Sequence, residues 1–260
     1  MKRLSLLLIL VSAAYLVGCT PAYQQGTEQP STATKAAEIN TQLGIIFMQQ
    51  GKRDLALKKF KQALRQDSRL PSAHEAIAIL YQELGEIRKA GEHYEEAARL
   101  DPKDPIIQNN YGAFLCSQNK VKRAERHFMI AIKNPLYKTP QDAYTNAGLC
   151  LLRIPDRNKA EAYFRKALQV DPKAPIALRE MARLNYHGGH YLNARAYLQR
   201  YAAVAPQTPD TLWLGIRIER KLGDQNAVAS YSLLLKNKFP DSEQARKLIE
   251  SEHNEHHPQQ

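Results

Sequence analysis

Three cysteines and two groups of histidines are the side chains of this 260-residue chain whose types and positions suggest chemistry. A cysteine can carry a lipid, form a disulfide or bind a metal, and a histidine can bind a metal or transfer a proton. The histidines are the weaker candidates, because His187 and His190 flank a Gly-Gly turn and His253, His256 and His257 lie in a polar tail. The sequence contains no Gly-rich phosphate loop, nucleophile elbow or HExxH motif, so we expect no catalytic residue, no cofactor and no metal site.

Cys19 ends a segment that has the layout of a secretory signal. Lys2 and Arg3 precede a mostly apolar run at 4–17, which is too short to cross a bilayer comfortably. The run closes on LVGC at 16–19, which resembles the bacterial lipobox, so cleavage after residue 18 would make Cys19 the lipid-carrying first residue. An ordinary signal peptide with a chance cysteine is the alternative.

The residues after Cys19 indicate a destination. Thr20 follows the cysteine, and in didermal bacteria a second mature residue other than Asp implies delivery to the outer membrane, here on its periplasmic face. Residues 20–36 are rich in Thr, Gln, Pro, Ser and Ala, a composition typical of a disordered linker. We therefore expect a lipidated cysteine and flexible tether over 19–36, with a reach on the order of 50 Å.

Cys116 and Cys150 are the remaining cysteines and lie 34 residues apart. An even pair in an exported protein favours a disulfide, because oxidising compartments preserve such bonds. Two buried free thiols are the alternative. Metal binding by the pair is disfavoured, since no His or carboxylate accompanies them at ligand spacing.

The elements that position these cysteines follow from a repeat. Six alanines, each with a bulky residue four positions later and Gly or Ala twelve positions earlier, recur at intervals of 34, 34, 36, 34 and 33 residues. They are Ala56, Ala90, Ala124, Ala160, Ala194 and Ala227. This pattern is typical of the tetratricopeptide repeat, a helix–turn–helix unit. We expect an all-α, right-handed solenoid of six repeats over 37–242, and a short capping helix with a His-rich tail over 243–260.

The repeat pattern also predicts how the helices pack. The early Gly or Ala allows the second helix to approach the first, and the bulky residue lies one turn beyond the recurring Ala on the same helix face. We expect each bulky residue to fill the gap towards the next repeat.

Solenoids of this kind bind partners on their concave face, which positions 2, 5, 9 and 12 of each first helix line. Counted from Ala37, these positions and their neighbours give the candidate groove residues Ile45, Ile46, Met48, Glu75, Ile79, Gln82, Asn109, Asn110 and Asn146. The fifth repeat contributes Ile176, Arg179, Arg183 and Tyr186.

Two features of this set stand out. A helix with one buried face needs no apolar run such as IIFM at 45–48, so part of that run is either exposed for a partner or covered by residues before Ala37. Asn110 and Asn146 share the sixth position of their repeats, where an amide can bind a ligand backbone or, as we favour, a neighbouring helix end.

The chain is basic, with a formal charge of +11 that falls to +9 once Lys2 and Arg3 leave with residues 1–18. Its Lys and Arg are scattered over the second helices and form no block with interleaved aromatic residues. A solvated basic surface is therefore the favoured interpretation, and nucleic acid is not an expected partner.

Several stretches exceed the repeat consensus. They are NNYGAFLC at 109–116, NPLY at 134–137, NAGLC at 146–150 and LWLGIRIER at 212–220. These stretches resemble the type IV pilus biogenesis lipoproteins called PilF or PilW, a family with a lipobox, six repeats and paired cysteines.

The resemblance implies a pilotin, an outer-membrane lipoprotein that promotes assembly of the pilus secretin, the channel through which the pilus leaves the cell. The implied partners are the secretin subunit and, through acylated Cys19, outer-membrane lipid, with the protein monomeric before assembly. A general periplasmic adaptor that organises cell-wall enzymes is the competing hypothesis, because it would share the lipobox and the solenoid.

Overall fold

The computed structural model describes residues 31–154 and 156–256, with the side chains of 254–256 excluded. These residues form thirteen α-helices and, within the same ranges, no strand. The helices are α1 (Thr32–Gln49), α2 (Arg53–Gln66), α3 (Pro71–Glu83), α4 (Ile87–Leu100), α5 (Pro105–Ser117), α6 (Val121–Lys133), α7 (Pro140–Leu151), α8 (Arg157–Val170), α9 (Pro175–His187), α10 (Tyr191–Ala202), α11 (Pro209–Leu222), α12 (Gln225–Lys238) and α13 (Glu243–His256). No helix of the described part combines the length and apolar character needed to cross a bilayer.

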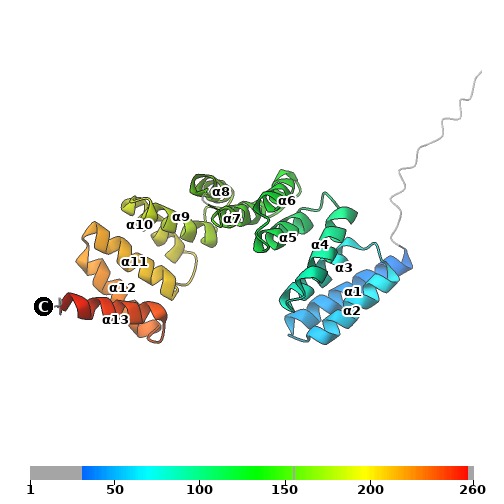
Figure 1. Cartoon of the computed structure of the whole chain (residues 1–260), viewed down its shortest axis with the longest axis horizontal. Helices are drawn as coiled ribbons and strands as arrows, with labels where there is room; N and C mark the ends of the chain where they lie inside the picture. Colours follow the sequence, from blue (N-terminus) through cyan, green and yellow to red (C-terminus); the bar gives the residue numbers. More distant parts are fainter. Residues whose placement is uncertain (1–30, 155, 257–260) are drawn as a thin grey trace, which may run out of the picture.

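The helices are arranged as six successive antiparallel pairs, from α1 with α2 to α11 with α12. Figure 1 shows the pairs following one another along an arch, with α5, α7 and α9 on its inner side and α6, α8 and α10 on its outer side. The α13 helix covers the last pair, where Ala245 and Leu248 join Leu212, Ile216 and Leu235 in one apolar cluster. The expected solenoid of tetratricopeptide repeats with a capping helix is confirmed.

The first helix begins earlier than the sequence suggested. Ser31 caps α1 by accepting a hydrogen bond from the backbone N–H of Thr34, at 3.1 Å. Thr34 Oγ1 also donates to Asp67 Oδ2 at 2.9 Å, which ties the added turn to the end of α2. Residues 32–36 therefore belong to the first repeat and not to the tether, while Cys19 lies outside the described residues.

Four of the six repeats show a bulky side chain that packs on a glycine of its own first helix. A methyl group added to Gly148 would lie 2.7 Å from Phe164 Cε1, and Gly44, Gly112 and Gly215 stand in the same relation to the rings of Phe60, Phe128 and Tyr231. These rings close the crossing within a repeat, which is why the position twelve residues before the recurring Ala stays small. The expected contact towards the next repeat is present at Tyr94 of the second repeat, whose ring lies 6.1 Å from that of Tyr111 and 5.0 Å from that of Phe114 in the third, centroid to centroid.

The turns inside the repeats depend on a left-handed residue. Gly51, Gly85, Gly189 and Gly223 have φ between 71° and 78°, where a side chain would be strained. In the third repeat Asn119 adopts φ 60° at the corresponding place, since Asn tolerates this region better than most residues. The 36-residue interval arises one repeat later, from the longer connections between α6 and α7 and between α7 and α8.

Candidate protein-binding surface

The apolar run of α1 is divided between the core and the surface. Phe47 and Met48 pack against the main core cluster, whereas Ile45 and Ile46 are 40% and 46% exposed. The additional turn of α1 does not cover them. Ile39 and Leu43, nearer the start of the same helix, are exposed as well. At about 100° per residue, Ile39, Leu43 and Ile46 share one face of α1, whereas Ile45 lies about 100° around the helix from Ile46, on the groove side. We call these four exposed side chains of α1 together the first-repeat apolar patch: Ile39, Leu43, Ile45 and Ile46.

The second repeat adds a smaller apolar contribution to the groove positions. Ile79 on α3 is partly buried and packs against the main core cluster, and Gln82 on the next turn is exposed. A partner that extends beyond α1 would therefore meet a more polar surface at α3.

Three of the candidate groove asparagines connect neighbouring inner helices. Asn110 Nδ2 on α5 donates to Glu75 Oε1 on α3 at 2.8 Å, and Asn146 Nδ2 on α7 donates to Asn109 Oδ1 on α5 at 3.0 Å. The amides thus bind side chains of the preceding inner helix, where the sequence had favoured a helix end. Burial raises the pKa of Glu75, with a further contribution from Asp104, and the hydrogen bond from Asn110 opposes this shift.

The structure joins Cys116 of α5 to Cys150 of α7 through a disulfide, with the two Cα atoms 5.6 Å apart. Both side chains are buried. Among the residues described, no group of three His, Cys, Asp or Glu side chains is arranged to hold a metal ion.

The stretch 212–220 forms most of α11 and is buried on two sides. Leu214 and Ile218 pack towards the fifth repeat, and Leu212 and Ile216 pack towards the capping helix. Because α11 packs against both the fifth repeat and the capping helix, it needs apolar residues at positions that the repeat consensus does not specify.

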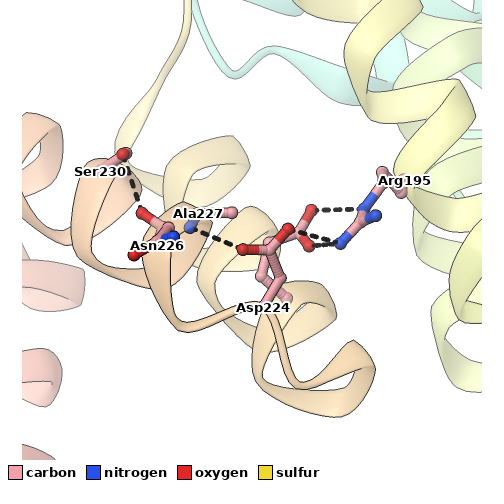
Figure 2. A network of polar contacts seen from close by, with 6 residues as sticks. Arg195, Asp224, Asn226, Ala227 and Ser230 are labelled. Atoms are coloured by element: carbon pink, nitrogen blue, oxygen red, sulfur yellow. Dashed lines mark hydrogen bonds and ion pairs between the residues drawn. The ribbon is translucent and has the colours of Figure 1, made fainter.

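A buried ion pair adds a polar link between the fifth and sixth repeats. Arg195 Nε on α10 donates to Glu219 Oε1 on α11 at 2.9 Å, and its Nη2 contacts the other oxygen of the same carboxylate. Figure 2 shows Arg195 facing Asp224, to which its Nη2 donates at 3.3 Å. Asp224 also caps α12 by accepting from the backbone N–H of Ala227 at 3.0 Å.

The histidines have structural surroundings that spacing did not reveal. His187 ends α9 and lines a pocket with residues of α11, while His190 occupies the N-cap position of α10 without a side-chain hydrogen bond to the helix backbone. His253 lies on α13, and the side chains of His256 and His257 fall outside the described residues.

Comparison with known proteins agrees with the architecture. The tetratricopeptide repeat family matches residues 41–105, 76–135 and 149–218. The type IV pilus assembly protein PilF of Pseudomonas aeruginosa is 31% identical over 236 residues, which cover 90% of this chain and 94% of that protein. An uncharacterized protein of Haemophilus influenzae is 33% identical over 138 residues, which cover 53% of this chain and 77% of that one.

Two solved structures extend the relationship to the fold. The structure of Pseudomonas aeruginosa PilF aligns with a TM-score of 0.78 and 30% identity, over 85% of this chain and all of that one. PilW, described as a widely conserved type IV pilus biogenesis factor, aligns with a TM-score of 0.75 and 32% identity, over 82% and 98%. Sequence identity of this level along nearly the whole length, with the same succession of helix pairs, shows that the chain belongs to the PilF/PilW family of tetratricopeptide repeat proteins.

Proposed function

We propose that this protein acts in type IV pilus biogenesis as a pilotin. In this proposal it is an outer-membrane lipoprotein, anchored through Cys19, that binds the pilus secretin subunit on its repeat array and promotes its localisation and multimerisation. The observation that carries the proposal is the relationship, over 90% of the chain, to a protein named for type IV pilus assembly.

The first-repeat apolar patch supports a partner site near the anchor. It lies on α1, the first helix of the described residues, and a segment bound there by a protein anchored through Cys19 would stay close to the membrane. Burying the exposed parts of Ile45 and Ile46 would contribute about 1 kcal/mol each, at about 25 cal/mol per Å² of apolar surface. Confinement to one membrane raises the effective concentration of the two proteins and compensates for this modest affinity.

The anchor is tested with Cys19→Ala in a strain that carries its own pilus secretin. The secretin multimers are measured by gel electrophoresis of outer-membrane fractions, and twitching motility is scored in parallel. We expect this protein to leave the outer membrane and the secretin multimers to be depleted there. Normal multimers in a strain that lacks the whole gene would refute the pilotin proposal.

The patch is tested with the double variant Ile45→Asp, Ile46→Asp. Both side chains are exposed, so the fold should persist, and secretin multimers should decrease. Leu233→Asp is the matched control, because Leu233 on α12 is an exposed apolar residue far along the chain from α1. If Cys19→Ala abolishes assembly but the double variant does not, the patch is not the secretin site.

A further inference from the structure

A pocket lies between α9 and α11, at the opposite end of the array from the first-repeat apolar patch, and its lining is charged where the patch is apolar. It has a volume of about 260 Å³. Its walls include Arg179, Arg183, His187, Asp210, Trp213 and Arg217. Because Arg179 and Arg183 occupy groove positions of the fifth repeat, the pocket belongs to the face on which such arrays bind partners.

The charges around the pocket do not balance. Three guanidinium groups converge here, and the carboxylate of Glu180 serves two of them, accepting from Arg179 Nε at 2.8 Å and lying 3.7 Å from Arg183 Nη1. The other nearby carboxylate, Asp210, accepts a hydrogen bond from Gln244 Nε2 at 2.7 Å. Three positive charges against two negative ones leave one in excess.

The positive charges around the pocket also affect the pKa of His187. Burial lowers the pKa of His187, and the positive charges of Arg217, Arg157 and Arg183 lower it further. A positive pocket of this kind attracts anions.

Two contacts with Tyr186 fix the position of the Arg217 guanidinium. Its guanidinium lies over the ring of Tyr186, 4.4 Å from the centroid, and its Nε donates to the Tyr186 hydroxyl at 3.2 Å. A stacked guanidinium loses less freedom on binding a carboxylate than a mobile lysine would, and it offers paired N–H groups in a plane. Trp213 adds an aromatic wall beside it.

We propose that this pocket binds an acidic peptide segment of a protein partner, whose side-chain carboxylates pair with Arg183 and Arg217. The volume lies below the roughly 300 to 1,000 Å³ that is typical of pockets for small molecules, and suits one or two side chains. The site depends neither on the lipid anchor nor on the identity of the partner of α1, and gives the array a second contact point.

The test uses the full-length protein in detergent and two probes. The first probe is a tetraglutamate peptide with acetylated and amidated ends, and the second is the matching tetraglutamine peptide. Binding is measured by calorimetry, and the pKa of His187 is followed by NMR. We expect only tetraglutamate to bind, and its negative charge to raise the pKa of His187.

Arg183→Gln and Arg217→Gln should each weaken tetraglutamate binding about tenfold, the scale of one charge-assisted hydrogen bond. Arg183 is largely exposed, so its variant keeps the test valid if loss of Arg217 disturbs the stacking on Tyr186. Arg88→Gln is the matched control, because it removes one exposed charge from α4.

Three results would overturn the proposal. They are equal binding of the two peptides, equal weakening by Arg88→Gln, and binding of inorganic phosphate or anionic phosphatidylglycerol vesicles at this site without binding of tetraglutamate.

Discussion

Replacing Arg195 by Met should destabilise the C-terminal repeats far more than removal of a surface charge. The Glu219 side chain is 4% exposed and that of Arg195 28%, so the pair is largely withdrawn from water. Arg195→Met leaves the buried carboxylate of Glu219 without its main partner. Breaking a buried pair in this way costs about 3 to 5 kcal/mol, and the partial exposure of Arg195 places the expected value at about 3 kcal/mol.

The chain carries its own reporter for this region. Its single tryptophan, Trp213, lies on α11 between the fifth repeat and the capping helix. With a urea dependence of about 2 kcal/mol per M, a loss of about 3 kcal/mol moves the midpoint of the Trp213 fluorescence transition down by about 1 to 2 M. Far-UV circular dichroism reports all repeats, and its transition should separate from the fluorescence transition, because repeat arrays unfold locally.

Two further variants decide whether the ion pair is the cause. Arg195→Met combined with Glu219→Leu removes both charges, and should recover most of the loss because no unpaired charge remains. Arg88→Met breaks the exposed pair with Glu92 and should shift the midpoint by less than about 0.3 M. The reasoning fails if Arg195→Met leaves the Trp213 transition in place, or if the double variant is as unstable as the single one.

Other perturbations test the rest of the array. Cys116→Ser with Cys150→Ser should lower the free energy of unfolding by about 3 to 4 kcal/mol, as expected for a loop of 34 residues, and a thiol assay on the unreduced, unfolded wild-type chain should find neither cysteine free. Gly148→Ala forces a methyl group against the ring of Phe164 and should cost about 1 to 3 kcal/mol, read as a lower melting temperature; an unchanged melting temperature would contradict the close crossing. Because the pKa of Glu75 is raised above 4.5 in the folded protein, the stability that its neutral form confers is present below pH 4.5 and is lost as the pH rises through the raised pKa. Glu75→Gln should therefore be more stable than the wild type at pH 7, with a smaller difference at pH 4 in urea titrations; a difference that does not change with pH would contradict this.

The repeat architecture could be predicted from sequence because its signal is periodic. Six frames of small and bulky residues mark every helix pair, and the turn glycines separate the two helices of a unit. The start of α1 escaped this reasoning, because residues 32–36 have the composition of a linker, and it is Ser31 and Asp67 that hold them in helical form. Composition reports average behaviour, whereas one cap and one side-chain contact decide a helix end.

The candidate site was predictable only in part. Spacing placed Ile45 and Arg183 on the groove side, since helical position determines which face a side chain occupies. It could not show that Asn110 is already engaged by Glu75, or that Arg217 stacks on Tyr186 from the following repeat. Such contacts depend on how one helix pair is rotated against the next, which the period of a repeat does not specify.

The disulfide changes how a pulling force would pass along the arch of repeats. A tensile load applied at the two ends passes from repeat to repeat through packed side chains, but between α5 and α7 it also passes through a covalent bond. That junction lies near the middle of the array, beside the loops that break the regular period. Under a pulling force the outer repeats would therefore unfold before the third and fourth repeats, which the disulfide holds together.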